Sequence, residues 1–341
     1  MKEFSSHSDF KYNTIINQKI EQFSHSIAIN QNNSLLLISN STKIEIFVIL
    51  EEKLKKIQQI ICHKRKVVSL NFFRTNRLFI TGSFDSQIIL WSTIMMSNPK
   101  QIQKLLGHNS TIQCIIKRLP NEDLIISCST DYTIKFWIQL PKNNQQWICS
   151  QNISVHQNIV WGISINQQGN QVISSGEDHL ILVIEQNQQT QNWFIKQMIQ
   201  VDQSGFSLCY INKNAFVFQP ESSENLIVYT LNENQEFIQF QNFKVFGKGY
   251  CCYPYFPSIY NNQKQLLINK NGNYLNIMKV QEENQDTKYN YTETEFSLKI
   301  IQVINYENYY IFGTLSDDGQ YLITWDNISR EIQFRKYQEI A

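Results

Sequence analysis

The chain has 341 residues, which is more than a single hydrophobic core usually organises, so its length favours either two domains or one closed repetitive architecture. Lys and Arg number 30 and Asp and Glu 29, for a formal net charge of +1. This balance argues against sequence-independent binding to nucleic acid or to an anionic membrane as the main activity. Asn and Gln are abundant, but they alternate with Ile, Val and Phe at strand spacing, so we interpret them as surface residues rather than a prion-like tract.

The cysteines do not form a disulfide pattern. Their number, seven, is odd and no Cys-x-x-Cys is present, so we expect reduced thiols. The first residues contain no apolar stretch typical of a signal peptide, and the longest apolar run, Ile44 to Leu50, is interrupted by Glu45 and too short to span a bilayer. The sequence therefore predicts a cytoplasmic location, with a nuclear one as the alternative.

The N-terminal region predicts strands. Tyr12 to Lys19 alternates in polarity like a short strand that stands apart from the units that follow. The segment 48–61 allows an amphipathic helix, but β-branched residues flank its charged centre, so we predict two strands joined by a charged hairpin.

One stretch, Gly107 to Trp137, defines a repeating unit. It contains a Gly-His pair, an Asp 23 residues after the His, and a Trp six residues after the Asp. The unit that begins at His63 repeats this pattern with spacings of 22 and six, and the unit that begins at His156 repeats it with Ile184 in place of the Trp. Three consecutive matches to one spacing indicate repeats that bury their apolar faces against one another.

The period continues beyond these units. Equivalent apolar ends occur at Phe47, Trp91, Trp137, Ile184, Tyr229, Ile277 and Phe334, which predicts seven units within one domain over residues 1–341. The one long step contains a polar insertion, residues 281–295, which we predict to be an exposed, mobile loop.

Each unit contains four short apolar segments of strand character. Four strands repeated at this period predict an all-β fold, a seven-bladed β-propeller of four-stranded antiparallel blades. The last unit lacks residues for its fourth strand, so we predict that Tyr12 to Lys19 pairs with Ile332 to Tyr337 and closes the ring.

The repeated residues resemble those of the WD-repeat family. This resemblance implies a rigid propeller that presents a face to protein partners within a multiprotein complex, without catalysis of its own. The stretch 147–165 is also similar to repeats of the cytosolic iron-sulfur assembly propeller, so a subunit of the cytosolic iron-sulfur cluster assembly and targeting complex is an alternative function. In the last unit Trp325 and Asp326 depart from the family pattern, because they lie inside the second strand.

The repeated His, Ser/Thr, Asp and Trp positions are candidate structural tetrads. A Ser-His-Asp catalytic triad is the competing interpretation. However, the same trio recurs in successive units, which a single active site does not require, so we predict a hydrogen-bond chain that stabilises each blade. The residues of these tetrads are His63, Thr81, Asp85 and Trp91, then His108, Ser127, Asp131 and Trp137, then His156, Ser174 and Asp178.

The remaining candidate residues concern partners. No metal site or cofactor site is predicted, because the histidines and cysteines fall in separate units and Gly247 to Gly249 lacks the spacing of a phosphate-binding loop. A compact basic cluster and the residues before each turn Asp are expected to rim one face and to contact a protein or peptide partner. We expect Phe84 to be an exposed aromatic residue on this rim. The candidates are Lys64, Arg65, Lys66, Phe84, Thr130 and Glu177. A propeller enzyme, such as a hydrolase, is the remaining alternative and would need catalytic side chains that converge on the central channel. We expect a monomeric propeller within a complex.

Overall fold

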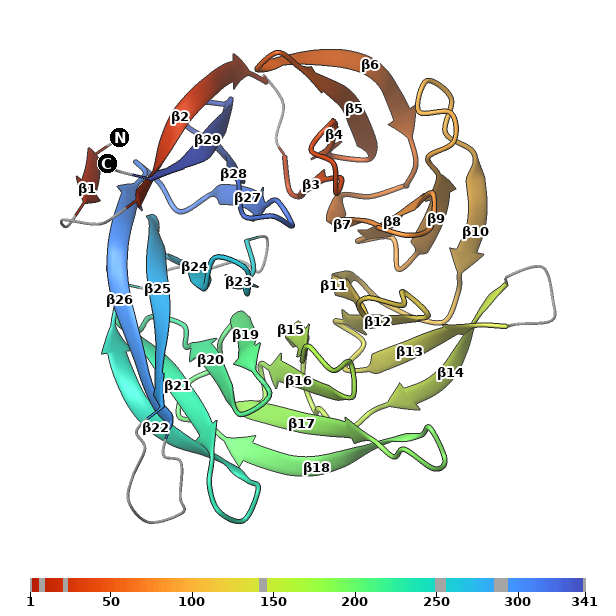
Figure 1. The fold of residues 1–341 in the computed structure, drawn as a ribbon. Helices are drawn as coiled ribbons and strands as arrows, with labels where there is room; N and C mark the ends of the chain where they lie inside the picture. Colours follow the sequence, from red (N-terminus) through yellow and green to blue (C-terminus); the bar gives the residue numbers. More distant parts are fainter. Residues whose placement is uncertain are drawn as a thin grey trace.

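The structure is a computed structural model that describes residues 2–5, 10–20, 24–140, 146–248, 256–284 and 294–339. Its strands form seven antiparallel sheets, and Figure 1 shows these sheets arranged as blades around a central axis. The prediction of a seven-bladed β-propeller is confirmed. The blades are numbered here in chain order, and within each blade the strands run from the innermost to the outermost.

Blades 1 to 4 take their four strands in sequence order. Blade 1 consists of β3 (Ile27–Ile29), β4 (Leu35–Asn40), β5 (Lys43–Leu50) and β6 (Lys53–Ile61). Blade 2 consists of β7 (Val67–Phe72), β8 (Leu78–Ser83), β9 (Ile88–Ser92) and β10 (Gln101–Leu105). Blade 3 consists of β11 (Ile112–Lys117), β12 (Leu124–Ser129), β13 (Ile134–Gln139) and β14 (Trp147–Ile153). Blade 4 consists of β15 (Val160–Ile165), β16 (Gln171–Gly176), β17 (Leu180–Gln186) and β18 (Trp193–Gln200).

Blades 5 to 7 continue the ring. Blade 5 consists of β19 (Ser207–Asn212), β20 (Ala215–Gln219), β21 (Asn225–Leu231) and β22 (Phe237–Lys244). Blade 6 consists of β23 (Ile259–Asn261), β24 (Leu266–Asn271), β25 (Tyr274–Asn284) and β26 (Thr294–Asn305). Blade 7 consists of β27 (Ile311–Leu315), β28 (Tyr321–Asp326), β29 (Glu331–Glu339) and β2 (Phe10–Lys19).

The N-terminal segment closes the ring, as predicted. Strand β2 pairs antiparallel with β29, with Tyr12 opposite Tyr337 and Gln18 opposite Ile332. The sequence did not predict β1 (Lys2–Ser5), which pairs with β26 and makes blade 6 five-stranded. The first 20 residues thus connect two blades, and β1 lies outside β26 in Figure 1.

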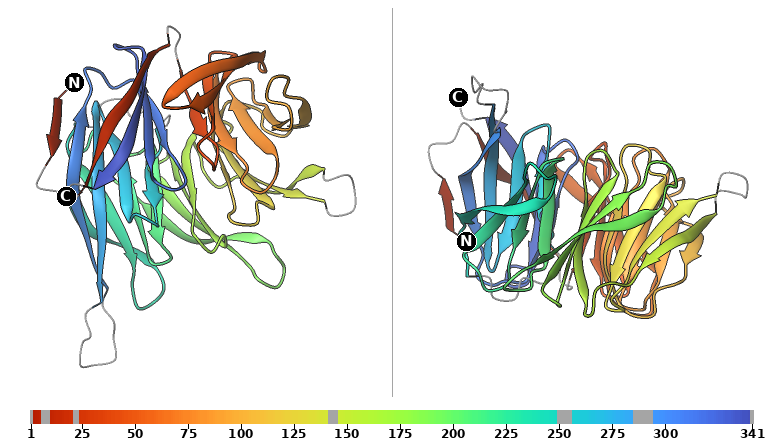
Figure 2. Two further views of the ribbon diagram at one scale, coloured as in Figure 1. Left: turned by 45° about the horizontal axis from the view of Figure 1, so that its top comes forward. Right: turned by 90° about the horizontal axis from the view of Figure 1, so that it is seen from below.

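The predicted loop at 281–295 is wrong at both ends. Strand β25 continues to Asn284 and β26 begins at Thr294, so part of the insertion lengthens the β25–β26 hairpin, and these two strands are the long blue ones in Figure 2. Its tip, like the Cys251-Cys252 pair, lies outside the described residues. The segment 48–61 forms β5 and β6, as the two-strand interpretation predicted.

Apolar residues pack between successive blades. The interface of blades 3 and 4, for example, contains Phe136, Leu182 and Trp193, and the rings of Phe136 and Trp193 stack at 4.7 Å. The predicted unit ends, from Phe47 to Phe334, all lie on the third strand of a blade.

Glutamine side chains connect the outermost strands of neighbouring blades. Gln103 Nε2 donates to the carbonyl of Trp147 at 2.7 Å, while Gln103 Oε1 accepts from the Trp147 backbone N–H at 2.9 Å. The same bidentate contact joins Gln151 to Trp193, Gln197 to Phe237 and Gln302 to Tyr12. Each of these glutamines follows a β-bulge in its outer strand. We call these four contacts the glutamine latches; the last one holds the closing strand β2.

Candidate functional site

The tetrad of blade 3 forms a continuous hydrogen-bond chain. His108 Nδ1 lies 2.8 Å from Asp131 Oδ2, and His108 Nε2 lies 2.8 Å from Ser127 Oγ. The indole N–H of Trp137 donates to the same Ser127 Oγ at 2.9 Å. Asp131 also accepts the backbone N–H of Asn109, so the carboxylate joins the turn before β13 to the loop before β11.

Blades 2 and 4 repeat this geometry. In blade 2, His63 contacts Asp85 at 3.0 Å and Thr81 Oγ1 at 2.7 Å, and the Trp91 indole donates to Thr81 at 3.3 Å. In blade 4 the chain from Asp178 through His156 ends at Ser174, which lies 2.9 Å from His156 Nε2. Ile184 occupies the Trp position there, so this hydroxyl receives no indole N–H.

Burial and hydrogen bonding shift the pKa values of tetrad side chains in blades 2 and 3. Burial would raise the pKa of Asp131, but hydrogen bonds from His108 and Thr133 hold this pKa well below its ordinary value of 3.8. Burial lowers the pKa of His63, and Asp85 only partly opposes this shift. A neutral His63 can donate from Nδ1 to Asp85 and accept the hydroxyl of Thr81, whose oxygen accepts the Trp91 indole N–H.

The geometry of a catalytic triad is thus present, but no substrate can reach it. Ser127 and Thr81 are both fully buried, and each hydroxyl is bonded to a histidine and a tryptophan. A nucleophile needs an open approach for the reacting carbonyl. The hydroxyls of these tetrads have no such approach, because they lie inside buried hydrogen-bond chains.

The predicted rim residues occupy one repeated position. The backbone N–H groups of Phe84, Thr130 and Glu177 donate to the carbonyls of Lys66, Thr111 and Ile159, which lie just before the innermost strands of the same blades. We call the face formed by these turns and by the histidine loops the histidine face. Glu221 and Asn327 make the same contact in blades 5 and 7, to Ser204 and Tyr310. The sequence missed them because no His-Asp spacing marks those blades.

The basic cluster lies on this face. Lys64, Arg65 and Lys66 are all exposed, and the ion pairs found between described residues include none of them. Phe84, expected to be exposed, is half-buried instead, because its backbone is held against Lys66. Thr130 and Glu177 are half-buried as well.

A second cluster lies on the histidine face at blades 4 and 5. The indole N–H of Trp161 donates to Glu177 Oε2 at 2.5 Å, and the Trp161 and Phe206 rings meet edge to face at 4.8 Å. Burial, and then the charge of Glu177, raise the pKa of the Glu221 carboxyl. We call Trp161, Glu177, Phe206 and Glu221 the acidic-aromatic cluster.

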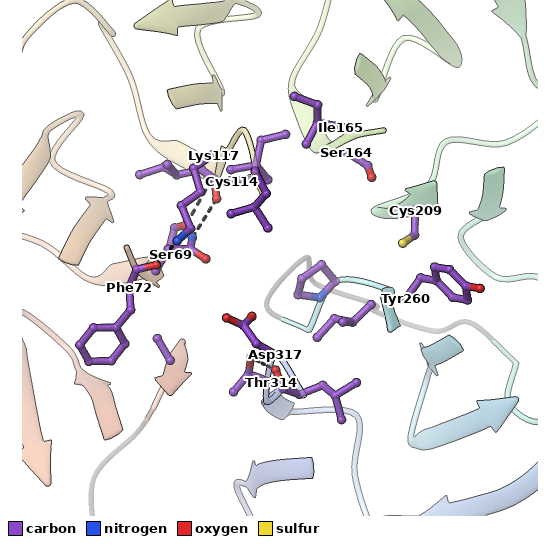
Figure 3. A pocket seen from close by; sticks show the side chains of 18 of the residues that line it. Ser69, Phe72, Cys114, Lys117, Ser164, Ile165, Cys209, Tyr260, Thr314 and Asp317 are labelled. Carbon is purple, nitrogen blue, oxygen red and sulfur yellow. Dashed lines mark hydrogen bonds between the residues drawn. The ribbon is translucent and has the colours of Figure 1, made fainter. Parts of the chain in front are cut away.

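The central channel encloses a cavity of about 730 Å³ lined by the innermost strands and the loops that follow them. Figure 3 shows Lys117, Cys114, Cys209 and Asp317 around it. Lys117 is bonded to Glu122 and to the Phe72 carbonyl. Burial raises the pKa of Cys114 to about 11 and that of Cys209 to about 12, so neither thiol is an activated nucleophile.

The described part of the chain also bears on metal binding and on membrane insertion. No group of three or more His, Cys, Asp or Glu side chains there is placed to hold a metal ion. The same residues include no helix that is long and apolar enough to cross a membrane.

Comparison with known proteins agrees with this geometry. The family model described as WD domain, G-beta repeat, matches residues 54–92, 99–137 and 147–185. The chain is 27% identical over 116 residues to the protein transport protein SEC13 of Chaetomium globosum. This match covers 33% of the present chain and 39% of SEC13. It is 29% identical over 137 residues to the nuclear distribution protein PAC1 of Komagataella phaffii, and this match covers 36% of the present chain and 26% of PAC1. It is 27% identical over 104 residues to the mouse pre-mRNA-processing factor 19, and this match covers 30% of the present chain and 19% of the mouse protein.

These matches cover less than half of each relative's length. The fold and the repeated tetrads define the class, a β-propeller in which buried His-Asp pairs stabilise the blades. The three matched repeats lie between β6 and β17, and over these residues the chain is similar to the WD-repeat family of β-propeller proteins. Members of this family generally serve as non-catalytic protein-interaction scaffolds.

Proposed function

We propose that this protein is a non-catalytic interaction platform whose histidine face captures a segment of a protein partner. The observation that carries the proposal is the basic cluster, Lys64 to Lys66, which is exposed and lacks ion pairs to described residues. Its backbone is fixed, because Asp85 accepts the N–H of Lys64 and Phe84 donates to the carbonyl of Lys66. Preorganised cations of this kind lower the entropic cost of binding an acidic segment.

Phe84 adds an apolar contact beside these charges. Because it is half-buried, part of its ring stays accessible while its position is fixed. A fixed aromatic ring flanked by basic side chains is typical of interface residues that contribute most of the binding energy. Thr130, in the next blade, extends the same rim. We place the platform in the cytoplasm, where reduced thiols persist.

Affinity purification tests this proposal. Wild type, Lys64→Glu with Arg65→Glu, and the triple change of Lys64, Arg65 and Phe84 to Ala would be compared by quantitative identification of co-purifying proteins. Partners that depend on the histidine face should be lost from both variants. The matched control is Lys53→Glu with Lys55→Glu, which reverses two exposed charges on the outermost strand of blade 1. Equal recovery of all partners by every variant would refute a site at the basic cluster.

Assembly with iron-sulfur components stays a prediction from the sequence. It would be supported if cytosolic iron-sulfur assembly proteins were among the partners recovered. Their absence from the co-purified set would remove this alternative while leaving the platform proposal intact.

A further inference from the structure

Three buried or half-buried glutamates elsewhere in the ring have lysine partners. Glu45, Glu122 and Glu185 are each paired with a lysine from the same blade, at Lys56, Lys117 and Lys196. Glu177 and Glu221 take part in no ion pair between described residues. Both are half-buried, where water screens like charges less than at an open surface.

The backbone brings these two carboxylates together. Glu177 and Glu221 occupy the same rim position in neighbouring blades, as the hydrogen bonds to Ile159 and Ser204 show. The pKa of Glu221 is raised first by burial and then by the charge of Glu177. A cation supplied from outside would relieve the repulsion between these two half-buried carboxylates.

Aromatic rings border this pair. Trp161 is half-buried and its indole N–H is held by Glu177, which fixes the ring, and Phe206 packs edge to face against it. The faces of aromatic rings attract cations, and indole is the strongest of them. The combination suits a positively charged side chain that contacts a carboxylate with its charged end and a ring with its alkyl or planar part.

An amide oxygen on the innermost strand of the adjoining blade also lacks a donor. Gln113 is the bulged residue of β11, and Trp161 is the bulged residue at the equivalent place in β15. Gln113 lines the channel and is only 6% exposed, yet its Oε1 has no hydrogen-bond partner in the described structure. A buried acceptor without a donor is costly, and a ligand rich in N–H groups would satisfy it.

We propose that the acidic-aromatic cluster, on the histidine face at blades 4 and 5, binds a cationic side chain of a partner segment. Arginine suits the cluster better than lysine, because a planar guanidinium can lie on Trp161 while its several N–H groups donate to Glu177 and Glu221. This inference rests on the proposed platform function and extends it: the histidine face carries a basic site at blade 2 and an acid-lined site at blades 4 and 5. The partner segment would then carry acidic residues toward one site and a basic residue toward the other.

The Trp161 indole N–H provides a direct test by NMR on the full chain. Its resonance, assigned with Trp161→Phe, would be followed during titration with N-acetyl-arginine N-methylamide and with the neutral analogue N-acetyl-citrulline N-methylamide. A saturable shift with the arginine compound and none with the citrulline compound is expected. Equal shifts with both compounds, or no shift with either, would overturn the proposal. The lysine compound is the third arm, and tighter binding of it than of the arginine compound would overturn the arginine assignment.

Matched glutamates identify the residue responsible. Glu221→Gln should weaken arginine binding roughly fivefold, as loss of one partly exposed charge interaction does. Glu224→Gln, three residues away at an exposed carboxylate that lies 3.6 Å from Lys244, should leave it unchanged. Glu221→Gln also relieves repulsion from Glu177, so its melting temperature should equal or exceed that of wild type, which excludes unfolding as the cause. Equal weakening by both variants would place the effect outside the cluster.

This test is separable from that of the platform function. Loss of partners in the Lys64 and Arg65 variants without arginine binding would refute the second site and leave the platform proposal standing. If the cluster bound arginine but partner recovery did not depend on the basic cluster, the basic site of the platform would be refuted and the acid-lined site would stand.

Discussion

Blades 2 to 4 and blade 7 stabilise equivalent turns with different side chains. In blade 2, Thr81 is bonded to His63, 18 residues before it, and to Trp91, ten residues after it. In blade 7, Tyr306 donates to Thr324, also 18 residues on, and Arg335 Nη1 donates to the same hydroxyl, 11 residues further along. The hydroxyl on the second strand keeps its place, while tyrosine replaces histidine and arginine replaces tryptophan.

Blades 5 and 6 use yet another arrangement. Ser258 Oγ donates to Asn269 Oδ1 at 2.8 Å, and Asn269 Nδ2 donates to Gln219 Oε1 at 2.9 Å. Ser207 of blade 5 joins this network through its hydroxyl, 2.8 Å from Ser258. All four residues are buried, and the network crosses between two blades instead of closing within one. What the fold requires at these turns is therefore satisfied polar groups, and the residue types that supply them are interchangeable.

The closing strand of blade 7 offers the largest test of this comparison. Deletion of residues 1–20 removes β1 and β2, leaves the edge of β29 unpaired and exposes apolar residues that pack on Tyr12 and Ile16. We expect a loss of more than about 5 kcal/mol in the free energy of unfolding, enough to abolish a cooperative transition. Denaturant unfolding followed by circular dichroism measures it.

Deletion of residues 1–5 is the matched control for that experiment. It removes β1 but retains β2 and its pairing with β29, so we expect a much smaller loss. If the proteins that lack residues 1–5 and residues 1–20 had equal free energies of unfolding, ring closure by β2 would contribute nothing to stability.

Arg335 provides the next largest effect. Its side chain is fully buried and donates hydrogen bonds to Thr324 and Gln333. The guanidinium carbon lies 5.8 Å from the centre of the Tyr306 ring. Arg335→Ala should cost about 3 to 5 kcal/mol, because a large cavity forms and buried acceptors lose their donor. Arg330→Ala, at an exposed position in the preceding turn, should cost less than about 0.5 kcal/mol. Thermal unfolding compares them; similar values would mean that the arginine of blade 7 does not replace the tryptophan of blades 2 and 3.

The number of blades and ring closure could be predicted from sequence, because strand alternation and the His-Asp spacing are set by local geometry. Arg335 and Tyr306 could not be identified in this way, since neither residue type marks a blade. The 18-residue separation of Tyr306 and Thr324 was the available signal. The rim position of Glu221 depends on a turn without the Asp, and β1 is only four residues long, so both needed the structure. The acidic-aromatic cluster joins side chains of two blades, which periodicity within one unit does not reveal.

His25 of blade 1 should make the stability of the protein depend on pH. His25 is buried, and burial, followed by the charge of Lys66, lowers its pKa from 6.5 to about 4. The folded state thus favours the neutral imidazole, so this contribution is complete above pH 6.5 and is lost as the pH falls toward 4. At pH 5 the loss relative to pH 7 should be about 2 kcal/mol. Denaturant unfolding at both values tests this, and His25→Gln should reduce the difference; an unchanged difference would refute the assignment.

The missing tryptophan of blade 4 allows a comparison within the tetrads. Ser127→Ala in blade 3 removes a partner from both His108 and Trp137, whereas Ser174→Ala in blade 4 affects only His156. The first should cost about 2 kcal/mol and the second about 1 kcal/mol, because each buried group left without a partner adds its own penalty. Chemical denaturation of the two variants measures the difference. Equal costs would show that the indole contributes no bond of consequence.

Loss of a glutamine latch should have the smallest effect on the free energy of unfolding. The latches occur both in blades with tetrads and in blades without them, so they do not depend on the tetrads. Gln151→Met keeps the length of the side chain but removes both hydrogen bonds to Trp193, so we expect a loss of about 1 kcal/mol. Gln302→Met, which releases the closing strand at Tyr12, should cost at least as much and should also speed hydrogen exchange at the Tyr12 amide. Gln200→Met, at an exposed position of β18, is the control. If exchange at Tyr12 were unchanged in Gln302→Met, β2 would be held by its pairing with β29 alone.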